Sequence, residues 1–204
     1  MNKEHHVLIA PGLDGRIDGI TRVTSSWPKR FKLIPEAIVI PWKDGSHFYP
    51  HLARITERID ELTAQGHRVS LVGTSAGGSA MLNAFADRRR DVYRVVNVCG
   101  FSLPVDTHGP RSFINRGKSS LAFRESVNRF ANLKDNISER DLQRVLTVRS
   151  LLDELVPPSA TKIDGAVNKR IYMIEHIASI ALALIVYEPV VKFLTEVNSV
   201  EFLK

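Results

Sequence analysis

The sequence has a single cysteine and no long hydrophobic run. Because Cys99 has no second cysteine to pair with, an intramolecular disulfide framework is excluded. The most apolar run, residues 177–187, has 11 residues, whereas a membrane-spanning helix needs about 20. The apolar stretch near the N-terminus is too short to be a signal peptide. These absences predict a protein without a transmembrane segment, in the reducing environment of the cytoplasm.

The chain also has no internal repeat and no low-complexity tract, which excludes repeat and linker-rich architectures. Of its 204 residues, 44% are hydrophobic and 25% are charged, as in an ordinary globular protein. A chain of this length can bury one sizeable core. We therefore expect a single domain over residues 1–204.

The net charge of +6 is concentrated in one part of the chain. Residues 111–149 contain nine basic and four acidic side chains, and so hold five of the six net positive charges. Such a segment can attract nucleic acid, anionic lipid or an acidic partner, or it can be the solvated face of helices. The sequence has no helix-turn-helix, zinc motif or aromatic RNA-binding motif, so we expect no nucleic-acid partner.

Short apolar runs alternate along the chain with segments of helical periodicity. Pro50 begins one helical segment, and Gly66 suits its C-terminal cap. Six runs are expected to be strands: 6–12, 36–42, 68–73, 94–100, 144–150 and 169–175. The alternation predicts an α/β protein with three layers, α/β/α, and a mostly parallel central sheet of about six strands. Ligands bind beyond the carboxyl ends of such strands, so we expect the functional residues there.

One strand end carries Gly73-Thr74-Ser75-Ala76-Gly77, a Gly-x-Ser-x-Gly motif between a strand and a helix. A serine hydroxyl is a weak nucleophile until a neighbouring base takes its proton, and it must stand clear of the backbone to reach a carbonyl carbon. A sharp strand-to-helix turn exposes the hydroxyl at the cost of backbone strain, and glycines leave room for that turn. The N-terminus of the helix then presents the amide of Ala76 to a developing oxyanion.

A carboxylate and an imidazole follow two later strands. Asp153 comes after the fifth expected strand, in the segment LLDELVPP. His176 comes after the sixth, and it is the only histidine beyond Asp153. Serine, aspartate and histidine thus appear in the chain order that accompanies the serine motif. Asp106, after the fourth expected strand, is the alternative acid.

In these motifs the chain resembles the α/β-hydrolase superfamily, over residues 6–203 and in a compact form that lacks the family's first two strands. The resemblance implies a catalytic triad with Ser75 as the nucleophile, Asp153 as the acid and His176 as the base. It also implies an oxyanion hole formed by the backbone N–H groups of Ala76 and Leu13. The second donor is implied because PGLDG stands where many members have His-Gly-x-x-G, although proline replaces the usual histidine here.

Three further residues near these strand ends are candidates for the pocket wall. Asp14 lies in the PGLDG segment, Trp42 ends the second expected strand, and Thr74 precedes the motif serine. Helix capping is the alternative role for Asp14, and packing in the core is the alternative for Trp42.

His47 and His51 have the spacing of a metal-binding pair on a helix. Pro50 lies between them, however, and no third ligand is evident from the sequence. We therefore expect no metal ion and no cofactor in the functional site.

The basic segment falls between the fourth and fifth expected strands, where the superfamily commonly inserts a lid. An apolar face accompanies its charges, formed by Phe113, Leu121, Phe123, Val127, Phe130 and Leu133. We expect a small helical lid at residues 104–143, whose positive charge would favour an anionic substrate. A lid with a merely solvated outer face is the alternative.

These observations predict a serine hydrolase that cleaves a carboxylic ester or a thioester through an acyl-enzyme intermediate. Its expected partner is a small-molecule acyl ester. Thioesterase activity and acyl transfer to an acceptor other than water are alternatives on the same site. A non-catalytic binding protein is an alternative on the same fold, but the intact serine, aspartate and histidine argue against it.

Overall fold

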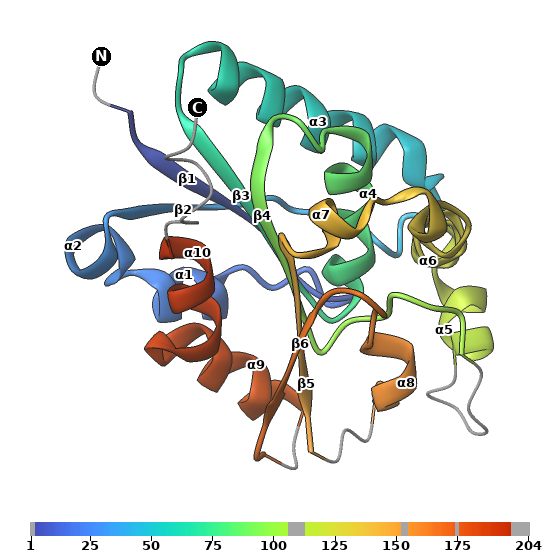
Figure 1. Cartoon of the computed structure of the whole chain (residues 1–204). Coiled ribbons are helices and arrows are strands. Elements are labelled where there is room, and N and C mark those ends of the chain that lie inside the picture. Colours follow the sequence, from blue (N-terminus) through green and yellow to red (C-terminus); the bar gives the residue numbers. More distant parts are fainter. Residues whose placement is uncertain (1–2, 106–112, 152–154, 174–175, 197–204) are drawn as a thin grey trace.

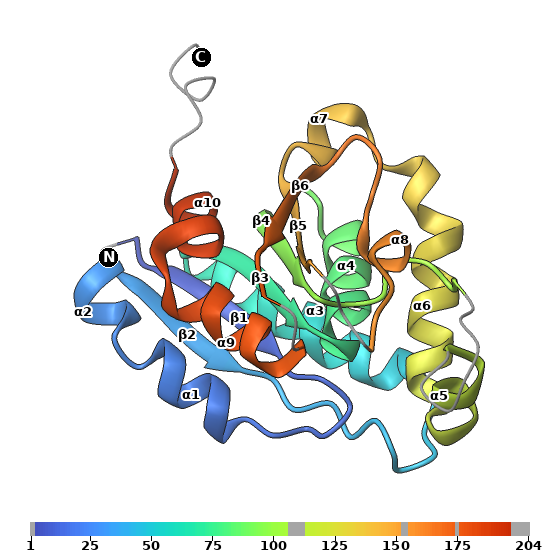
Figure 2. The ribbon, with the colours of Figure 1, turned by 90° about the horizontal axis from the view of Figure 1, so that it is seen from below.

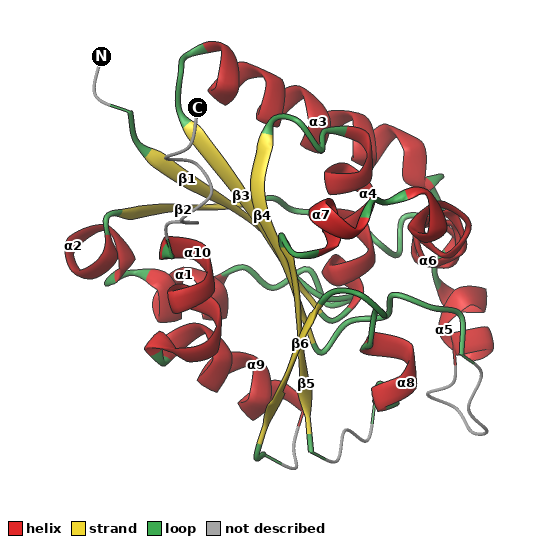
Figure 3. Cartoon of the chain, viewed as in Figure 1, coloured by secondary structure: helices red, strands yellow, loops and turns green. Residues whose placement is uncertain are grey.

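Six parallel strands form the centre of the fold (Figures 1 and 3). The computed structural model describes residues 3–105, 113–151, 155–173 and 176–196. The strands are β1 (His5–Ala10), β2 (Leu33–Ala37), β3 (Arg68–Thr74), β4 (Val92–Val98), β5 (Val145–Ser150) and β6 (Val167–Ile171), in the order β2-β1-β3-β4-β5-β6. All five neighbouring pairs are parallel, so the predicted parallel sheet of six strands is confirmed.

The central strands are buried on both faces. Side chains of β1 point alternately to the two faces, so that Leu8 contributes to one apolar cluster and Val7 to the other, and both are 0% exposed. The edge strands β2 and β6 are less buried. This burial explains why a continuous apolar run identifies the inner strands from sequence.

The predicted position of the second strand, 36–42, is wrong. Strand β2 ends at Ala37, and after a last hydrogen bond from the Ile38 amide to the Ile9 carbonyl at 2.9 Å the chain leaves the sheet. Ile40 and Trp42 are nonetheless only 1% and 2% exposed, because they pack into the core beneath the helices. An apolar loop that returns to the core has the same composition as a buried strand, and periodicity does not separate the two.

Helices cover both faces of the sheet (Figure 2). On one face lie α3 (Phe48–Ala64), α4 (Ala76–Asp87) and α6 (Leu121–Leu133); on the other lie α1 (Asp18–Thr24), α2 (Trp27–Phe31) and α9 (His176–Ile185). The shorter elements are α5 (Phe113–Ser119), η1 (Lys134–Asn136), α7 (Glu139–Leu142), α8 (Pro158–Thr161), η2 (Tyr187–Val191) and α10 (Lys192–Thr195). The three expected layers are therefore present.

Helix α3 begins at Phe48 rather than at the expected Pro50. Its first N–H group is capped from a distant helix, because the carboxylate of Glu125 accepts a hydrogen bond from the Phe48 amide at 2.7 Å. The same carboxylate contacts His47 Nδ1 at 2.7 Å. The cap thus comes from 77 residues away, and local capping patterns do not reveal it.

Helix α6 belongs to the helical layer beside α4. Its side chains Phe123, Val127 and Phe130 are all 0% exposed. The Ser126 hydroxyl hydrogen-bonds that of Ser79 at 2.6 Å, and the Asn83 side-chain amide donates to the Ser126 carbonyl at 2.7 Å. The lid at 104–143 stays a prediction, and its residues 106–112 lie outside the part of the chain that the structure describes.

The helix expected at 177–187 is present as α9, but only one side of it is buried. Ala183 and Leu184 are 0% exposed, whereas Ile177 and Ile185 are 69% and 54% exposed. The Trp27 indole donates to the Leu184 carbonyl at 3.1 Å and fixes α9 against α2. Among the described residues no single helix has the length and hydropathy to cross a membrane, and only the bent pair His176–Ile185 with Pro189–Thr195 reaches that length and hydropathy when both segments are taken together.

His5 at the start of β1 makes the stability of the fold depend on pH. Burial, together with the positive charge of Arg68, lowers the pKa of His5 to about 3. Its Nε2 atom hydrogen-bonds the Ser70 hydroxyl at 2.8 Å, and its ring lies edge-on against Tyr93. The folded chain therefore keeps this imidazole neutral where the unfolded chain protonates it.

We expect the free energy of unfolding to fall as the pH is lowered below about 6.5, the ordinary pKa of histidine. The contribution of His5 to this fall ends near pH 3, where the folded chain also protonates the ring. At pH 5 the loss from His5 is about 2 kcal/mol relative to pH 7.5. Urea unfolding at both pH values, in the wild-type protein and in His5→Gln, measures it. Glutamine keeps a hydrogen-bonding group near Ser70 but does not titrate. Equal losses in the two proteins would contradict the assignment to His5.

Candidate active site

Ser75 occupies the turn between β3 and α4. Its backbone angles are φ 52° and ψ −121°, which place it among the few non-glycine residues with positive φ. These angles resemble those of the first central residue of a type II′ turn, a position that glycine dominates. The Ser75 amide donates to the Val98 carbonyl at 2.9 Å and fixes the turn to β4. A strained serine held in this way indicates a functional position.

Two of the predicted glycines make this turn possible. A Cβ atom on Gly73 would lie 2.3 Å from the carbonyl oxygen of Gly77. A Cβ atom on Gly77 would lie 2.2 Å from the carbonyl oxygen of Ala10, at the end of β1. Both obstacles are backbone atoms, so no side-chain movement relieves them. The glycines allow the first turn of α4 to lie directly against the carboxyl ends of β3 and β1.

The segment after β1 passes beside the serine. A Cβ atom on Gly12 would lie 3.0 Å from Cβ and 3.4 Å from Oγ of Ser75. The chain then turns, with the Gly15 amide donating to the Gly12 carbonyl at 3.0 Å. Leu13, the second oxyanion candidate, is thus one residue away from a direct neighbour of Ser75. Ala76, the first candidate, is the first residue of α4, where backbone amides have no partner within the helix.

A cavity of about 670 Å³ opens beside this segment. Asp14 and Trp42, both pocket candidates from the sequence, line it together with Leu13. The Trp42 indole donates to the Pro11 carbonyl at 3.4 Å, and this hydrogen bond connects the cavity wall formed by Trp42 to the segment beside Ser75. The remaining lining residues are Gly15, Arg16, Val39, Ile40, Pro41, Lys43 and Asp44.

The rim of this cavity carries both signs of charge. Asp14 faces Lys43 at 3.8 Å. Hydrogen bonds from the hydroxyl and the amide of Ser46 lower the pKa of Asp44, so this carboxylate stays ionised at neutral pH. Burial lowers the pKa of His51, whose Nε2 atom hydrogen-bonds the Ser46 hydroxyl at 2.6 Å. A rim of mixed charge can orient a polar substrate without selecting strongly for either sign.

Thr74, the third pocket candidate, is buried at 3% exposure. Its hydroxyl donates to the Ala10 carbonyl at 3.4 Å, and therefore connects β3 to β1.

His176 is the first residue of α9, and its side chain is 3% exposed. Hydrogen bonds connect the carboxyl ends of β5 and β6, the strands that precede the two remaining triad candidates in the sequence. The Ser150 hydroxyl and the Leu151 amide, at the end of β5, donate to the Met173 carbonyl after β6 at 2.6 and 3.1 Å. Because all six strands are parallel, these ends lie at the same edge of the sheet as Ser75 (Figure 1).

The two candidate acids are not placed by the structure. Asp153 falls in the range 152–154 and Asp106 in the range 106–112, and both ranges lie outside the described residues. The pairing of an acid with His176, and the approach of His176 to Ser75, stay predictions from the sequence.

Sequence reasoning missed Asn97 on β4. Its side-chain amide donates to the Gly100 carbonyl at 3.0 Å, and its Oδ1 atom is buried without a hydrogen-bond partner among the described residues. A Cβ atom on Gly78 would lie 2.0 Å from this oxygen, and one on Gly100 would lie 2.2 Å from it. Asn97 therefore fills the space beneath the Ser75 turn. An amide within the otherwise apolar run RVVNVCG is the signal that could have identified it.

No protein-family model and no curated protein matches this sequence. Several solved structures match the fold. The enol-lactonase from Burkholderia xenovorans is 16% identical, with a TM-score of 0.67 over 96% of this chain and 93% of that one. The hydrolase from Oleispira antarctica is 13% identical, with a TM-score of 0.65 over 96% and 93%. The meta-cleavage product hydrolase from Pseudomonas fluorescens is 16% identical, with a TM-score of 0.64 over 97% and 93%.

At such identities the likeness concerns the arrangement of the backbone, not the chemistry of the site. The similar structures are α/β-hydrolases, and they align with nearly the whole of this chain. The chain therefore has the α/β-hydrolase fold, as its motifs predict.

Proposed function

We propose that the protein is a serine hydrolase that cleaves a carboxylic ester or thioester, with Ser75 as the nucleophile. The observation that carries this proposal is the strained turn that holds Ser75 at the carboxyl edge of the sheet, beside Gly12, whose neighbour Leu13 lines a cavity. Among the similar structures are lipolytic enzymes and a monoacylglycerol lipase, which agree with such an activity. We place the protein in the cytoplasm, because its single cysteine, Cys99, is buried and the chain has no second cysteine for an intramolecular disulfide.

The proposed reaction uses two displacements at the acyl carbon. In the first, His176 takes the proton of the Ser75 hydroxyl while Oγ attacks the carbonyl carbon. Asp153 orients the imidazole and stabilises its charged form. The tetrahedral intermediate then expels the alcohol or thiol, which takes the proton from His176. The product of this step is an acyl-enzyme.

Water completes the cycle. His176 removes a proton from a water molecule, whose oxygen attacks the acyl carbon. The bond between this carbon and Ser75 Oγ then breaks, the carboxylic acid leaves, and His176 gives its proton to Oγ. In both steps the N–H groups of Ala76 and Leu13 donate to the oxyanion. Each such donor contributes about 2.7–4 kcal/mol to the stability of the transition state.

The proposed substrate is a small acyl ester bound in the cavity between residues 13–16 and 39–44. Part of the positive charge at 111–149 is used within the fold, because Arg129 pairs with Asp87 at 2.8 Å and Arg144 with Asp141. A preference for an anionic ester, if the proposed lid provides it, must come from the other basic side chains of that segment.

A fluorophosphonate probe tests the nucleophile directly, since it modifies a serine that a neighbouring base activates. We expect the wild-type protein to be labelled and Ser75→Ala to remain unlabelled. Ser25→Ala, at an exposed serine directly after α1, is the matched control and should label like the wild type. A wild-type protein that does not react, or equal labelling of Ser75→Ala, would refute the proposal.

A further inference from the structure

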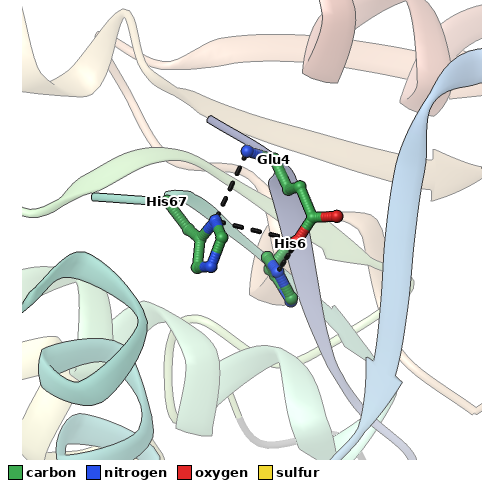
Figure 4. Close-up of side chains that lie close together, drawn as sticks. All are labelled: Glu4, His6 and His67. Atoms are coloured by element: carbon green, nitrogen blue, oxygen red, sulfur yellow. Dashed lines mark hydrogen bonds and ion pairs between the residues drawn. The ribbon is translucent and has the colours of Figure 1, made fainter. Parts of the chain in front are cut away.

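Two histidines and a glutamate meet at the amino end of the sheet, opposite the edge that carries Ser75 (Figure 4). Glu4 immediately precedes β1 and His6 is its second residue, so the two side chains lie on the same face of the extended chain. His67 immediately precedes β3 and lies on that face too, as does Val69 two residues later. Three metal-binding side chains therefore come together from two adjacent strands.

The possible ligand atoms are close to one another. His6 Nε2 is 3.4 Å from Glu4 Oε2, and His67 Nδ1 is 3.8 Å from the same oxygen. All three atoms lie within 4.8 Å of one another. In a tetrahedral zinc site with bonds of about 2.0–2.1 Å, two ligand atoms are about 3.3 Å apart. To complete such a geometry the His67 ring would approach the other two ligands by up to about 1.5 Å, and its Nδ1 atom would give up the hydrogen bond that it accepts from the Glu4 amide at 3.4 Å.

The backbone holds this arrangement in place before any ion binds. The Arg68 amide donates to the Glu4 carbonyl at 2.8 Å, which sets β1 against β3. Gly66, with φ 82°, ends helix α3, and the His67 amide donates back to the Leu62 carbonyl at 3.0 Å. The ligands therefore stand on the ends of a strand and a helix rather than on a long loop, which lowers the entropic cost of binding.

His6 gives an independent reason to expect a ligand here. Both of its ring nitrogens are buried and make no hydrogen bond within the part of the chain that the structure describes. Buried polar nitrogens without a partner are uncommon in folded proteins. The Nε2 atom has only its ion-pair contact with the Glu4 carboxylate at 3.4 Å, and a metal ion there would bind both groups.

The donor set selects the class of ion. Two imidazoles and one carboxylate suit zinc and its neighbours in the first transition row, whereas Ca²⁺ and Mg²⁺ prefer oxygen ligands. The side chains of His6 and His67 are 12% and 14% exposed and that of Glu4 is 50% exposed, so water can reach a fourth position.

We infer that Glu4, His6 and His67 form a binding site for one divalent ion of the zinc class. The ion joins the N-terminal segment before β1 to the entrance of β3. Because the ligands require the folded sheet, binding stabilises the folded state in proportion to the free ion concentration. The site is separate from the proposed hydrolase chemistry, and neither depends on the other.

Calorimetric titration of the EDTA-treated, dialysed full chain with ZnCl₂ tests this inference. We expect one Zn²⁺ per chain and a rise in melting temperature on addition of Zn²⁺. His67→Gln and Glu4→Gln should each weaken binding by about 10-fold or more, because each removes one of three ligands. His47→Gln, at an exposed histidine outside the cluster, is the matched control and should bind like the wild type.

Absorption of bound Co²⁺ in the visible range gives a second readout that reports coordination geometry. Tetrahedral bands that appear in the wild type and disappear in His67→Gln support the site. Circular dichroism establishes that each variant is folded before its binding is compared. Absence of Zn²⁺ binding by the wild type, or equal affinity in the wild type and both ligand variants, overturns the inference.

Discussion

Replacing Ser75 with alanine or with glycine is expected to remove ester hydrolysis equally but to change stability differently. Either change removes the hydroxyl, and loss of a triad nucleophile lowers kcat by about 10⁴-fold to 10⁶-fold. Alanine keeps a Cβ atom at φ 52°, so the backbone strain remains. Glycine adopts this conformation without steric cost. Activity and strain can therefore be separated at one position.

The size of the stability difference follows from two opposing effects. Relief of a strained non-glycine conformation raises the free energy of unfolding by about 1–3 kcal/mol. The greater freedom of glycine in the unfolded chain lowers it by about 0.5–1 kcal/mol. We expect Ser75→Gly to be more stable than Ser75→Ala by about 1 kcal/mol, which corresponds to about 2–4 °C in Tm for a chain of this length.

Hydrolysis of p-nitrophenyl acetate and urea unfolding, measured on the wild type and both variants, provide the comparison. Esters of increasing acyl length extend it to substrate preference. If Ser75→Ala keeps substantial activity, Ser75 is not the nucleophile. If Ser75→Gly is less stable than Ser75→Ala, the backbone conformation at residue 75 is not strained.

The Ser75 turn could be predicted from sequence because all its requirements are local. Gly73 and Gly77 stand two residues on either side of the serine, and the strand before it and the helix after it have clear patterns. The parallel sheet could be predicted for a similar reason, since β1, β3 and β4 are continuous apolar runs between helices. The failure at β2 came from Ile40 and Trp42, which are buried without belonging to a strand.

Features that depend on register could not be predicted. The contact of Glu125 with the start of α3 joins residues 77 positions apart. The cluster of Glu4, His6 and His67 depends on the pairing of β1 with β3, in which His6 lies opposite Val69. Before that pairing is known, His67 is one of seven histidines in the sequence. The sequence spacing of His47 and His51 drew attention to a different pair, whose partners in the structure are Glu125 and Ser46.

Two glycines at the start of α4 are expected to respond differently to the same substitution. In Gly77→Ala the new Cβ atom would meet backbone atoms of Ala10 and Pro11 at 2.2–2.7 Å. In Gly78→Ala it would meet the side-chain oxygen of Asn97 at 2.0 Å, and the nearest backbone atom, Gly100 Cα, lies at 3.1 Å. The first obstacle is fixed by the sheet, whereas the second can be removed by a further substitution.

We expect Gly77→Ala to lower the free energy of unfolding by more than about 3 kcal/mol, because the helix must move off β1 to accept the methyl group. Gly78→Ala should cost about 1–3 kcal/mol. Adding Asn97→Ala should restore about 1–2 kcal/mol to Gly78→Ala, even though Asn97→Ala alone leaves the Gly100 carbonyl without its donor. The same addition should restore nothing to Gly77→Ala.

Urea unfolding of the three single variants and the two double variants measures both coupling energies. Fluorophosphonate labelling of the same proteins reports whether the turn still presents Ser75. Comparable rescue of Gly77→Ala and Gly78→Ala by Asn97→Ala would show that the side chain of Asn97, and not the Ala10 carbonyl, limits how closely α4 approaches the sheet. An absence of rescue in Gly78→Ala would show that the space beneath the turn is set by the Gly100 backbone. Either result would change which contacts are held responsible for the position of Ser75.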